Sequence, residues 1–158
     1  MPKITKVSEP SKALQKKMSD DFAVYEAQHG VHVNYEQFSL VATNDEGVEV
    51  GVINAYTAFA EIYLDDVWVH SDHRGKGYGR FLVESLEAHF KGQGFNNINL
   101  CTNDYNAPGF YEKLGFIKEF TRINTRNPKF NKSFYVKFFD EDNQTQGLLL
   151  ENLTDSEV

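Results

Sequence analysis

Ten residues near the middle of the chain, 71–80, constrain its fold more than any other segment; they read Ser-Asp-His-Arg-Gly-Lys-Gly-Tyr-Gly-Arg. An apolar run with strand-like spacing, 60–69, precedes them, and an apolar stripe at helical spacing follows from Tyr78 to Phe90. The segment is therefore a glycine-rich turn that leads from a strand into a helix. Residues 97–102 are the next strand, and this strand–loop–helix–strand order predicts a crossover whose two strands are parallel.

The segments on either side complete a mixed sheet. A turn signal, Asn44-Asp45-Glu46-Gly47, separates two runs of alternating apolar residues, which predicts an antiparallel hairpin. The other expected strands and helices are strands at 4–7, 36–42, 48–58, 116–123 and 130–139, a helix capped by Ser8 or Ser11 and ended by Gly30, and a short helix over 106–114. The prediction is an α/β (α+β) fold, a central mixed twisted sheet of six to seven strands flanked by helices.

Size and charge limit the classes of function. The chain has 158 residues, of which 41% are hydrophobic, and we expect a single domain over 1–140 followed by an acidic tail over 141–158. A net charge of −7 disfavours nucleic-acid binding and favours small cationic substrates, although acidic surfaces also serve solubility alone. One cysteine, Cys101, excludes an internal disulfide, and no apolar run spans a membrane or forms a signal peptide, so a cytoplasmic protein is expected.

The glycine-rich loop is suited to binding an anion. Glycines allow the backbone N–H groups to approach a ligand, and the helix start adds partial positive charge, which Arg74, Lys76 and Arg80 reinforce. The glycine spacing does not match a dinucleotide fingerprint, and Gly75-Lys76 is followed by glycine rather than by the Ser or Thr of a P-loop. The loop alone thus indicates either a pyrophosphate site or a tight turn with solvated basic residues.

Two segments resemble one family. Residues 67–79 resemble the acyl-CoA-binding motif of the GNAT superfamily, Gln/Arg-x-x-Gly-x-Gly/Ala, with Arg74, Gly77 and Gly79 at its fixed positions. Residues 106–116, Asn-Ala-Pro-Gly-Phe-Tyr-Glu-Lys-Leu-Gly-Phe, resemble the family's second motif, a helix carrying Tyr followed by Gly-Phe. The likeness covers residues 48–139 well and the N-terminal part less closely.

The resemblance implies a GNAT N-acetyltransferase that uses acetyl-CoA as co-substrate, with no metal, and acetylates a primary amine of a small molecule or a protein. It implies that three strand residues pair their backbone with the pantetheine arm, that the loop N–H groups hold the pyrophosphate, and that an asparagine binds the pantetheine amide. The implied contacts are Val67, Trp68, Val69, Arg74, Gly75, Lys76, Gly77, Tyr78, Gly79, Arg80, Asn106 and Phe110. In the family the asparagine often lies earlier, at the place of Asp104 here.

Tyr111 matches the family's general acid, which would protonate the leaving thiolate; the alternative is a packing aromatic. Asp65 is the first choice for the base that takes the amine proton, and a solvated strand end is the alternative. The other candidates considered are Glu61 and Asp66, whose orientation a bulge would alter, and His70 and His73, expected at the surface.

The acceptor and the partners are less constrained. Aromatic residues are hypothesised to line an acceptor pocket or to be core; they are Tyr35, Tyr56, Phe59, Tyr63 and Tyr135. A homodimer is considered, formed by the strand after Phe130 or by the leucines near Leu149. The second hypothesis for function is a regulatory module that binds acyl-CoA without catalysis. No nucleic acid and no membrane is expected as a partner.

Overall fold

The structure is a computed structural model that describes residues 1–106 and 108–139. It divides into two compact units, Met1–Asn34 and Tyr35–Val158, and each is described by itself. The expected acidic tail, 141–158, lies outside the described residues, and the expected extent of a single domain stays a prediction. No helix within the described ranges is long and apolar enough to cross a membrane.

The first unit contains one helix, α1 (Lys12–Gln28). Ser11 caps it, because its side-chain oxygen accepts a hydrogen bond from the Leu14 N–H at 3.2 Å, and Gly30 follows its end with φ 68°. The prediction of a strand at 4–7 is wrong: these residues form no regular structure. The unit contains no strand with which they could form ladder hydrogen bonds, and a strand without a neighbour is not stable.

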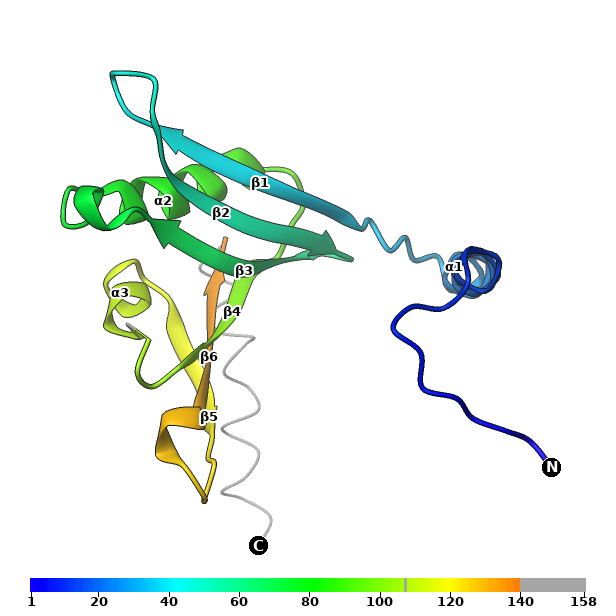
Figure 1. Cartoon of the computed structure of the whole chain (residues 1–158). Coiled ribbons are helices and arrows are strands. Elements are labelled where there is room, and N and C mark those ends of the chain that lie inside the picture. The colour runs from blue at the N-terminus through cyan, green and yellow to red at the C-terminus, as the bar shows by residue number, and fades with distance from the viewer. Residues whose placement is uncertain (107, 140–158) are drawn as a thin grey trace, which may run out of the picture. The chain divides into compact units, whose positions relative to one another are not determined.

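The second unit is built on one six-stranded mixed sheet, which confirms the predicted architecture (Figure 1). Its order is β1-β2-β3-β4-β6-β5; every neighbouring pair is antiparallel except β3 and β4, which are parallel as the crossover predicts. The strands are β1 (Glu36–Thr43), β2 (Glu49–Ala58), β3 (Glu61–Val69), β4 (Asn97–Asn103), β5 (Ile117–Arg122) and β6 (Lys132–Phe138).

Helix α2 (Tyr78–Phe90) covers one face of the sheet and forms the core with it. Its buried side chains pack against apolar side chains of the strands in one cluster. The buried helix residues are Leu82, Val83, Leu86 and Phe90, and their partners in the sheet include Val50, Ile53, Ile62, Leu64, Ile98 and Leu100. Burying such residues supplies most of the stability of a domain, roughly 1.5–3 kcal/mol for each large side chain.

Three later elements are shorter than expected, and one of them is strand β5, which covers Ile117–Arg122 rather than 116–123. Helix α3 covers Pro108–Lys113 rather than 106–114, because Asn106 still belongs to the turn after β4, where its N–H donates to the Asn103 carbonyl at 2.9 Å. Strand β6 begins at Lys132 rather than at 130, because Pro128–Phe130 form a 3₁₀ turn that the Asn127 side chain caps. Proline at the start of that turn favours helical over extended backbone.

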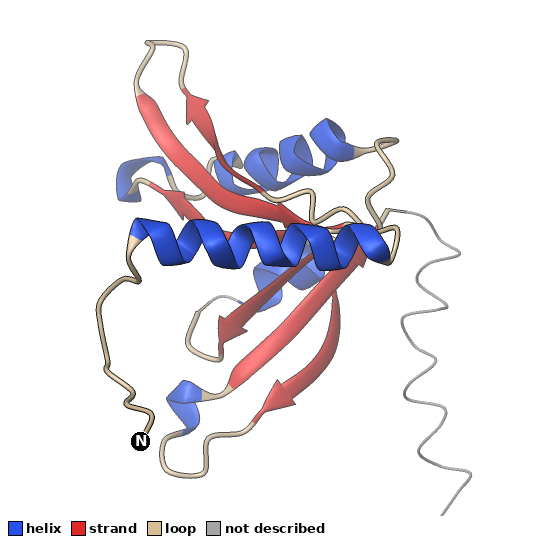
Figure 2. Cartoon of the chain, turned by 90° about the vertical axis from the view of Figure 1, so that its right-hand side faces the viewer, coloured by secondary structure: helices blue, strands red, loops and turns tan. Residues whose placement is uncertain are grey.

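The sheet opens between β3 and β4. These two strands pair only at Glu61–Tyr63 with Asn97–Asn99, although both continue further. A β-bulge in β3 lies where pairing stops, since Asn54 opposes Asp66 while Ala55 opposes Leu64, which leaves Asp65 as the extra residue. Figures 1 and 2 show the two halves of the sheet, β1–β3 and β4–β6, diverging beyond this point.

Candidate active site

The start of α2 presents free backbone N–H groups. Gly75 and Gly77 have φ values of 74° and 90°, in the left-handed region that side chains disfavour, and they turn the chain from the 3₁₀ segment Ser71–His73 into the helix. Gly77 is the N-cap residue of α2, and no side chain caps the helix. The first N–H groups of a helix have no partner within it, so this end is suited to an anion.

Two arginines line the same place. The Arg74 side chain folds back so that its Nε donates to the carbonyl oxygen of Val69 at 3.0 Å, and Arg80 lies in the first turn of α2 with its Nη1 3.3 Å from the Glu84 carboxylate. Both arginines line the cavity described next. The expected contact residue Lys76, which lies between Gly75 and Gly77, does not line it.

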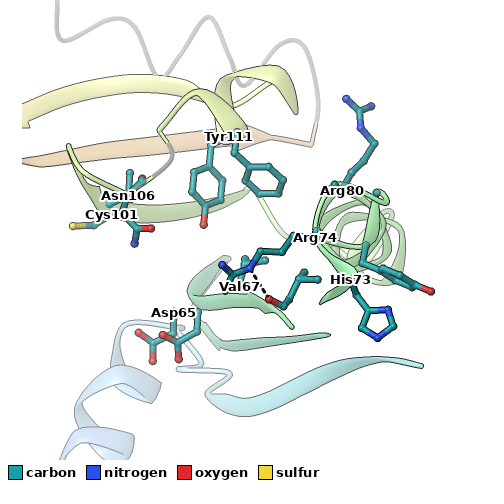
Figure 3. Close-up of a pocket in the computed structure, with 16 residues that line it drawn as sticks. Asp65, Val67, His73, Arg74, Arg80, Cys101, Asn106 and Tyr111 are labelled. Atoms are coloured by element: carbon teal, nitrogen blue, oxygen red, sulfur yellow. Dashed lines mark hydrogen bonds between the residues drawn. The ribbon is translucent and has the colours of Figure 1, made fainter. Parts of the chain in front are cut away.

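A cavity of about 540 Å³ joins the start of α2 to the opening between β3 and β4. It is lined by Asp65, Asp66, Val67, Val69, His73, Arg74, Gly75, Gly77, Tyr78, Gly79, Arg80, Cys101, Thr102, Asn106, Phe110 and Tyr111. Figure 3 shows Tyr111 and Asn106 on one wall and Asp65 and Val67 on the opposite wall. The cavity is thus cationic at the helix end and anionic at the bulge.

Tyr111 directs its hydroxyl into the cavity toward β3 (Figure 3). Its ring packs edge-on against Phe110 and Phe116 and lies 6.3 Å from the ring of the fully buried Tyr135. Burial, and after it the negative charge of Asp66, raises the pKa of Tyr111 from 10.0 to about 12. The phenol therefore keeps its proton at neutral pH, as a proton donor must.

The anionic end continues into a second cavity of about 350 Å³. Its lining consists of Gln37, Phe38, Ser39, Asn54, Ala55, Asp65 and Asp66, so both bulge carboxylates border both cavities. The five aromatic residues hypothesised to line an acceptor pocket border neither cavity, and Tyr135 instead donates its hydroxyl to the Glu112 carboxylate at 3.0 Å.

Four further cavity residues were not among the expected site residues: Asp66 and His73, which were considered only as alternative bases, and Cys101 and Thr102. Thr102 donates its hydroxyl to the Asn106 carbonyl oxygen at 2.8 Å and so holds the turn that carries Asn106. Among these residues, Asp66 is marked in the sequence, because the Asp65-Asp66 pair interrupts the apolar alternation of β3. Asp104, at the family's usual asparagine position, accepts a hydrogen bond from Asn131 at 3.1 Å instead of bordering the cavity.

Trp68, expected at the donor, does not line the cavity with its side chain. It points away from Val67 and Val69, which pack on the core, because side chains alternate along a strand. Trp68 is 47% exposed, and its ring lies edge-on to that of His70, which in turn contacts the His73 ring. His73 borders the cavity, and His70 caps the short 3₁₀ turn by accepting the Asp72 N–H.

Comparison with known proteins identifies a family and several relatives that this chain resembles. Residues 5–116 match the model of the acetyltransferase (GNAT) family. Blasticidin-S acetyltransferase of Streptomyces morookaense is 28% identical over 82 residues, which are 51% of this chain and 60% of that enzyme. The aligned part of the chain spans about half to three fifths of the length of the curated relatives that it matches.

Solved structures share the fold. A crystal structure of an acetyltransferase from Bacillus cereus superposes with a TM-score of 0.67 at 23% identity, over 85% of this chain and 97% of that one. An aminoglycoside 6'-N-acetyltransferase complexed with coenzyme A superposes with a TM-score of 0.59 at 19% identity, over 86% of this chain and 96% of that one. The family match covers most of the chain, and the chain therefore belongs to the acetyltransferase (GNAT) family.

Proposed function

We propose that the chain is an acetyl-CoA-dependent N-acetyltransferase that acetylates a primary amine. The observation that carries the proposal is that the 540 Å³ cavity has an uncapped helix start with two arginines at one end and two carboxylates with a phenol at the other. The first end suits a pyrophosphate, and the second suits an ammonium group. A molecule with both an anionic and a reactive end would span the distance between them.

The residues at the helix end fit the donor. The N–H groups of the first turn of α2 and the guanidinium groups of Arg74 and Arg80 are suited to phosphate oxygens. The backbone of Val67–Val69 has no strand partner in β4, so apart from the Val69 carbonyl, which accepts from Arg74, it is available for hydrogen bonds to the amide groups of pantetheine. Asn106 faces the same space. The donor would supply an acetyl thioester at the bulge end of the cavity.

The residues at the bulge end are suited to the two proton transfers of the reaction. An amine attacks a thioester only as the neutral base, so a group must take its proton, and the leaving thiolate then needs one. Tyr111 is proposed to supply that second proton, because its hydroxyl points into the cavity toward β3 and its phenol, with a pKa of about 12, is protonated at neutral pH. The sequence favours Asp65 as the group that takes the first proton; because Asp66 borders the same cavity, this role is assigned to the pair Asp65 and Asp66.

Binding of the donor is tested by thermal unfolding and calorimetry with a matched pair of variants. Gly77→Glu places a carboxylate at the helix start, whereas Gly94→Glu places one beyond the end of α2, at a residue with a similar φ (87° against 90°) and equally open surroundings. Acetyl-CoA at 100 times its dissociation constant stabilises a protein by about 2.7 kcal/mol. This stabilisation should vanish in Gly77→Glu and persist in Gly94→Glu; absence of binding to the unsubstituted protein at millimolar acetyl-CoA contradicts the proposal.

Catalysis is tested by thiol release over a broad panel of amines. Tyr111→Phe should lower the turnover rate by a factor of about 10² to 10⁴, the usual contribution of a general acid, while acetyl-CoA still binds. Equal turnover in the variant would show that Tyr111 is not the acid. Tight acetyl-CoA binding without turnover on any amine would instead favour a regulatory acyl-CoA-binding module.

A further inference from the structure

Three polar side chains form a hydrogen-bond chain across β1, β2 and β3. Ser39 Oγ lies 2.7 Å from Asn54 Oδ1, and Asn54 Nδ2 lies 3.2 Å from Asp66 Oδ2. The three residues are direct neighbours in the register of the sheet, Ser39 opposite Asn54 and Asn54 opposite Asp66. They share one face at the point where the bulge begins, and all three border the second cavity.

The chain has only one consistent direction. An ionised carboxylate accepts hydrogen bonds and donates none, so Asn54 must present its NH₂ group to Asp66 and its carbonyl oxygen to the Ser39 hydroxyl. The Ser39 hydroxyl thereby fixes the orientation of the Asn54 amide, and the amide fixes the orientation of the Asp66 carboxylate. Among the described residues no donor binds the other oxygen of Asp66, Oδ1, and none binds either oxygen of Asp65. These oxygens are available to a ligand.

The second cavity has a strong charge imbalance. Two of its seven lining residues are carboxylates, three others are polar, and none is Lys, Arg or His. A ligand with one ammonium group would neutralise only one of the two carboxylates. A ligand with two cationic groups would neutralise both, and charge-assisted hydrogen bonds to carboxylates are about twice as strong as neutral ones.

We infer that the second cavity is the acceptor site and that it selects a small hydrophilic molecule with at least two amines. Asp66, positioned by Ser39 and Asn54, binds the reacting ammonium group, and Asp65 pairs with the second cation. This inference rests on the proposed acetyl transfer and names its acceptor class. Ser39 and Asn54 act as positioning residues, because they reach the acceptor only through Asp66.

The reaction balances with these groups. The ammonium proton passes to Asp66, the neutral nitrogen forms a bond to the acetyl carbon, and the carbon–sulfur bond breaks. The thiolate takes a proton from Tyr111, and the nitrogen loses its second proton as the amide forms, which restores the Tyr111 phenol; Asp66 then releases the first proton to solvent. The net result is one acetamide, one free thiol and one proton released to solvent, with no oxidant or reductant.

The test compares acceptors that differ by one charge: 1,4-diaminobutane, 4-amino-1-butanol and 1-aminobutane. The unsubstituted protein should use the diamine with a kcat/KM about 10 to 100 times that for the two monoamines, as expected for one additional charged hydrogen bond. Asp65→Asn should remove this preference, because it should lower kcat/KM for the diamine by about 10 to 100 times more than for the monoamines. Asp66→Asn should lower kcat for every amine by about 100-fold or more.

The positioning chain is tested with a matched control on the same sheet. Asn54→Leu should raise KM for the diamine by about tenfold, and Ser39→Ala should raise it several-fold, with Ser39→Thr restoring it. Asn99→Leu removes an asparagine that binds Glu61 outside both cavities, and it should leave KM unchanged. Acetyl-CoA affinity should be the same in all these variants, because none of the substituted residues lies at the helix end.

A binding measurement separates failure of this inference from failure of the proposed function. The side-chain amide signals of Asn54, assigned by their loss in Asn54→Leu, should shift on addition of the diamine even without the donor, and should not shift in Asp66→Asn. If acetyl-CoA fails to bind, the proposed function is wrong. If acetyl-CoA binds but the diamine moves no Asn54 signal, or if monoamines or a single-lysine peptide react as well as the diamine, the assignment of the acceptor is overturned.

Discussion

Tyr111→Phe separates the role of a hydroxyl in chemistry from any role in folding. No described residue forms a hydrogen bond with this hydroxyl, and phenylalanine keeps the ring contacts with Phe110, Phe116 and Tyr135. At about pH 8 the free energy of unfolding of the variant should therefore lie within roughly 0.5 kcal/mol of the unsubstituted protein. The same variant should have lost most of its thiol-release activity.

At alkaline pH the free energies of unfolding of the two proteins should diverge. Burial, followed by the charge of Asp66, raises the pKa of Tyr111 from 10.0 to about 12, whereas in the unfolded chain the phenol ionises at its ordinary pKa. Between these values the unfolded state binds fewer protons than the folded state, so stability falls as the pH rises. One pKa unit corresponds to about 1.4 kcal/mol, so at about pH 11 the unsubstituted protein should have lost about 1.4 kcal/mol that the variant keeps.

Urea unfolding at about pH 8, 10 and 11 measures this difference. Tyr135, whose pKa burial and the bond to Glu112 also raise to about 12, is present in both proteins and cancels in the comparison. With a slope of about 1–3 kcal/mol per molar urea, the two midpoints should separate by roughly 0.5–1.4 M between pH 8 and pH 11. Parallel pH profiles would refute the reasoning, because they would mean that the phenol ionises equally in the folded and unfolded chains.

Two further substitutions test how α2 is held on the sheet. Lys137→Met should lower the free energy of unfolding by about 1–3 kcal/mol, because Lys137 Nζ lies 2.7 Å from Glu87 Oε2 and the two side chains are only 23% and 29% exposed. In chemical denaturation, a double-mutant cycle with Glu87→Gln should be non-additive, and an additive cycle contradicts the pairing. Gly51→Ala should cost about 1–3 kcal/mol, because a Cβ there would lie 3.0 Å from both Leu82 Cδ1 and the Trp68 carbonyl oxygen; an unchanged melting temperature would show that β2 and α2 can move apart freely.

Much of the fold could be predicted because local sequence signals and tertiary packing favour the same secondary structure in most of the chain. The apolar stripe of α2 and the turns rich in Gly, Asn and Pro mark their elements directly, and the crossover rule then makes β3 and β4 parallel. The segment 4–7 shows the limit: its composition suits a strand, but a strand also needs a neighbour, and sequence alone does not supply one. Ends of elements shifted where a cap, such as Asn127, competes with extended backbone.

The site was accessible to sequence analysis at its glycine end and much less at its bulge. Left-handed φ values at Gly75 and Gly77 follow from residue type, so the helix start could be anticipated. The roles of Ser39 and Asn54 could not be, because they depend on cross-strand register, and a one-residue change in register would move both side chains to the other face. The placement of Asp66 depends on the bulge in the same way.

The opening between β3 and β4 also gives this sheet an edge in its interior. Exposed strand edges are the usual starting points for aggregation, and proteins protect their outer edges with charges, bulges or short strands. The inner edge has two of these protections. The bulge at Asp65 twists it, and the charged Arg74 side chain donates a hydrogen bond to its last carbonyl oxygen, that of Val69. A pairing partner for this edge must therefore displace an arginine before it can extend along the strand, which favours a slender ligand that brings its own negative charge over a strand of another protein.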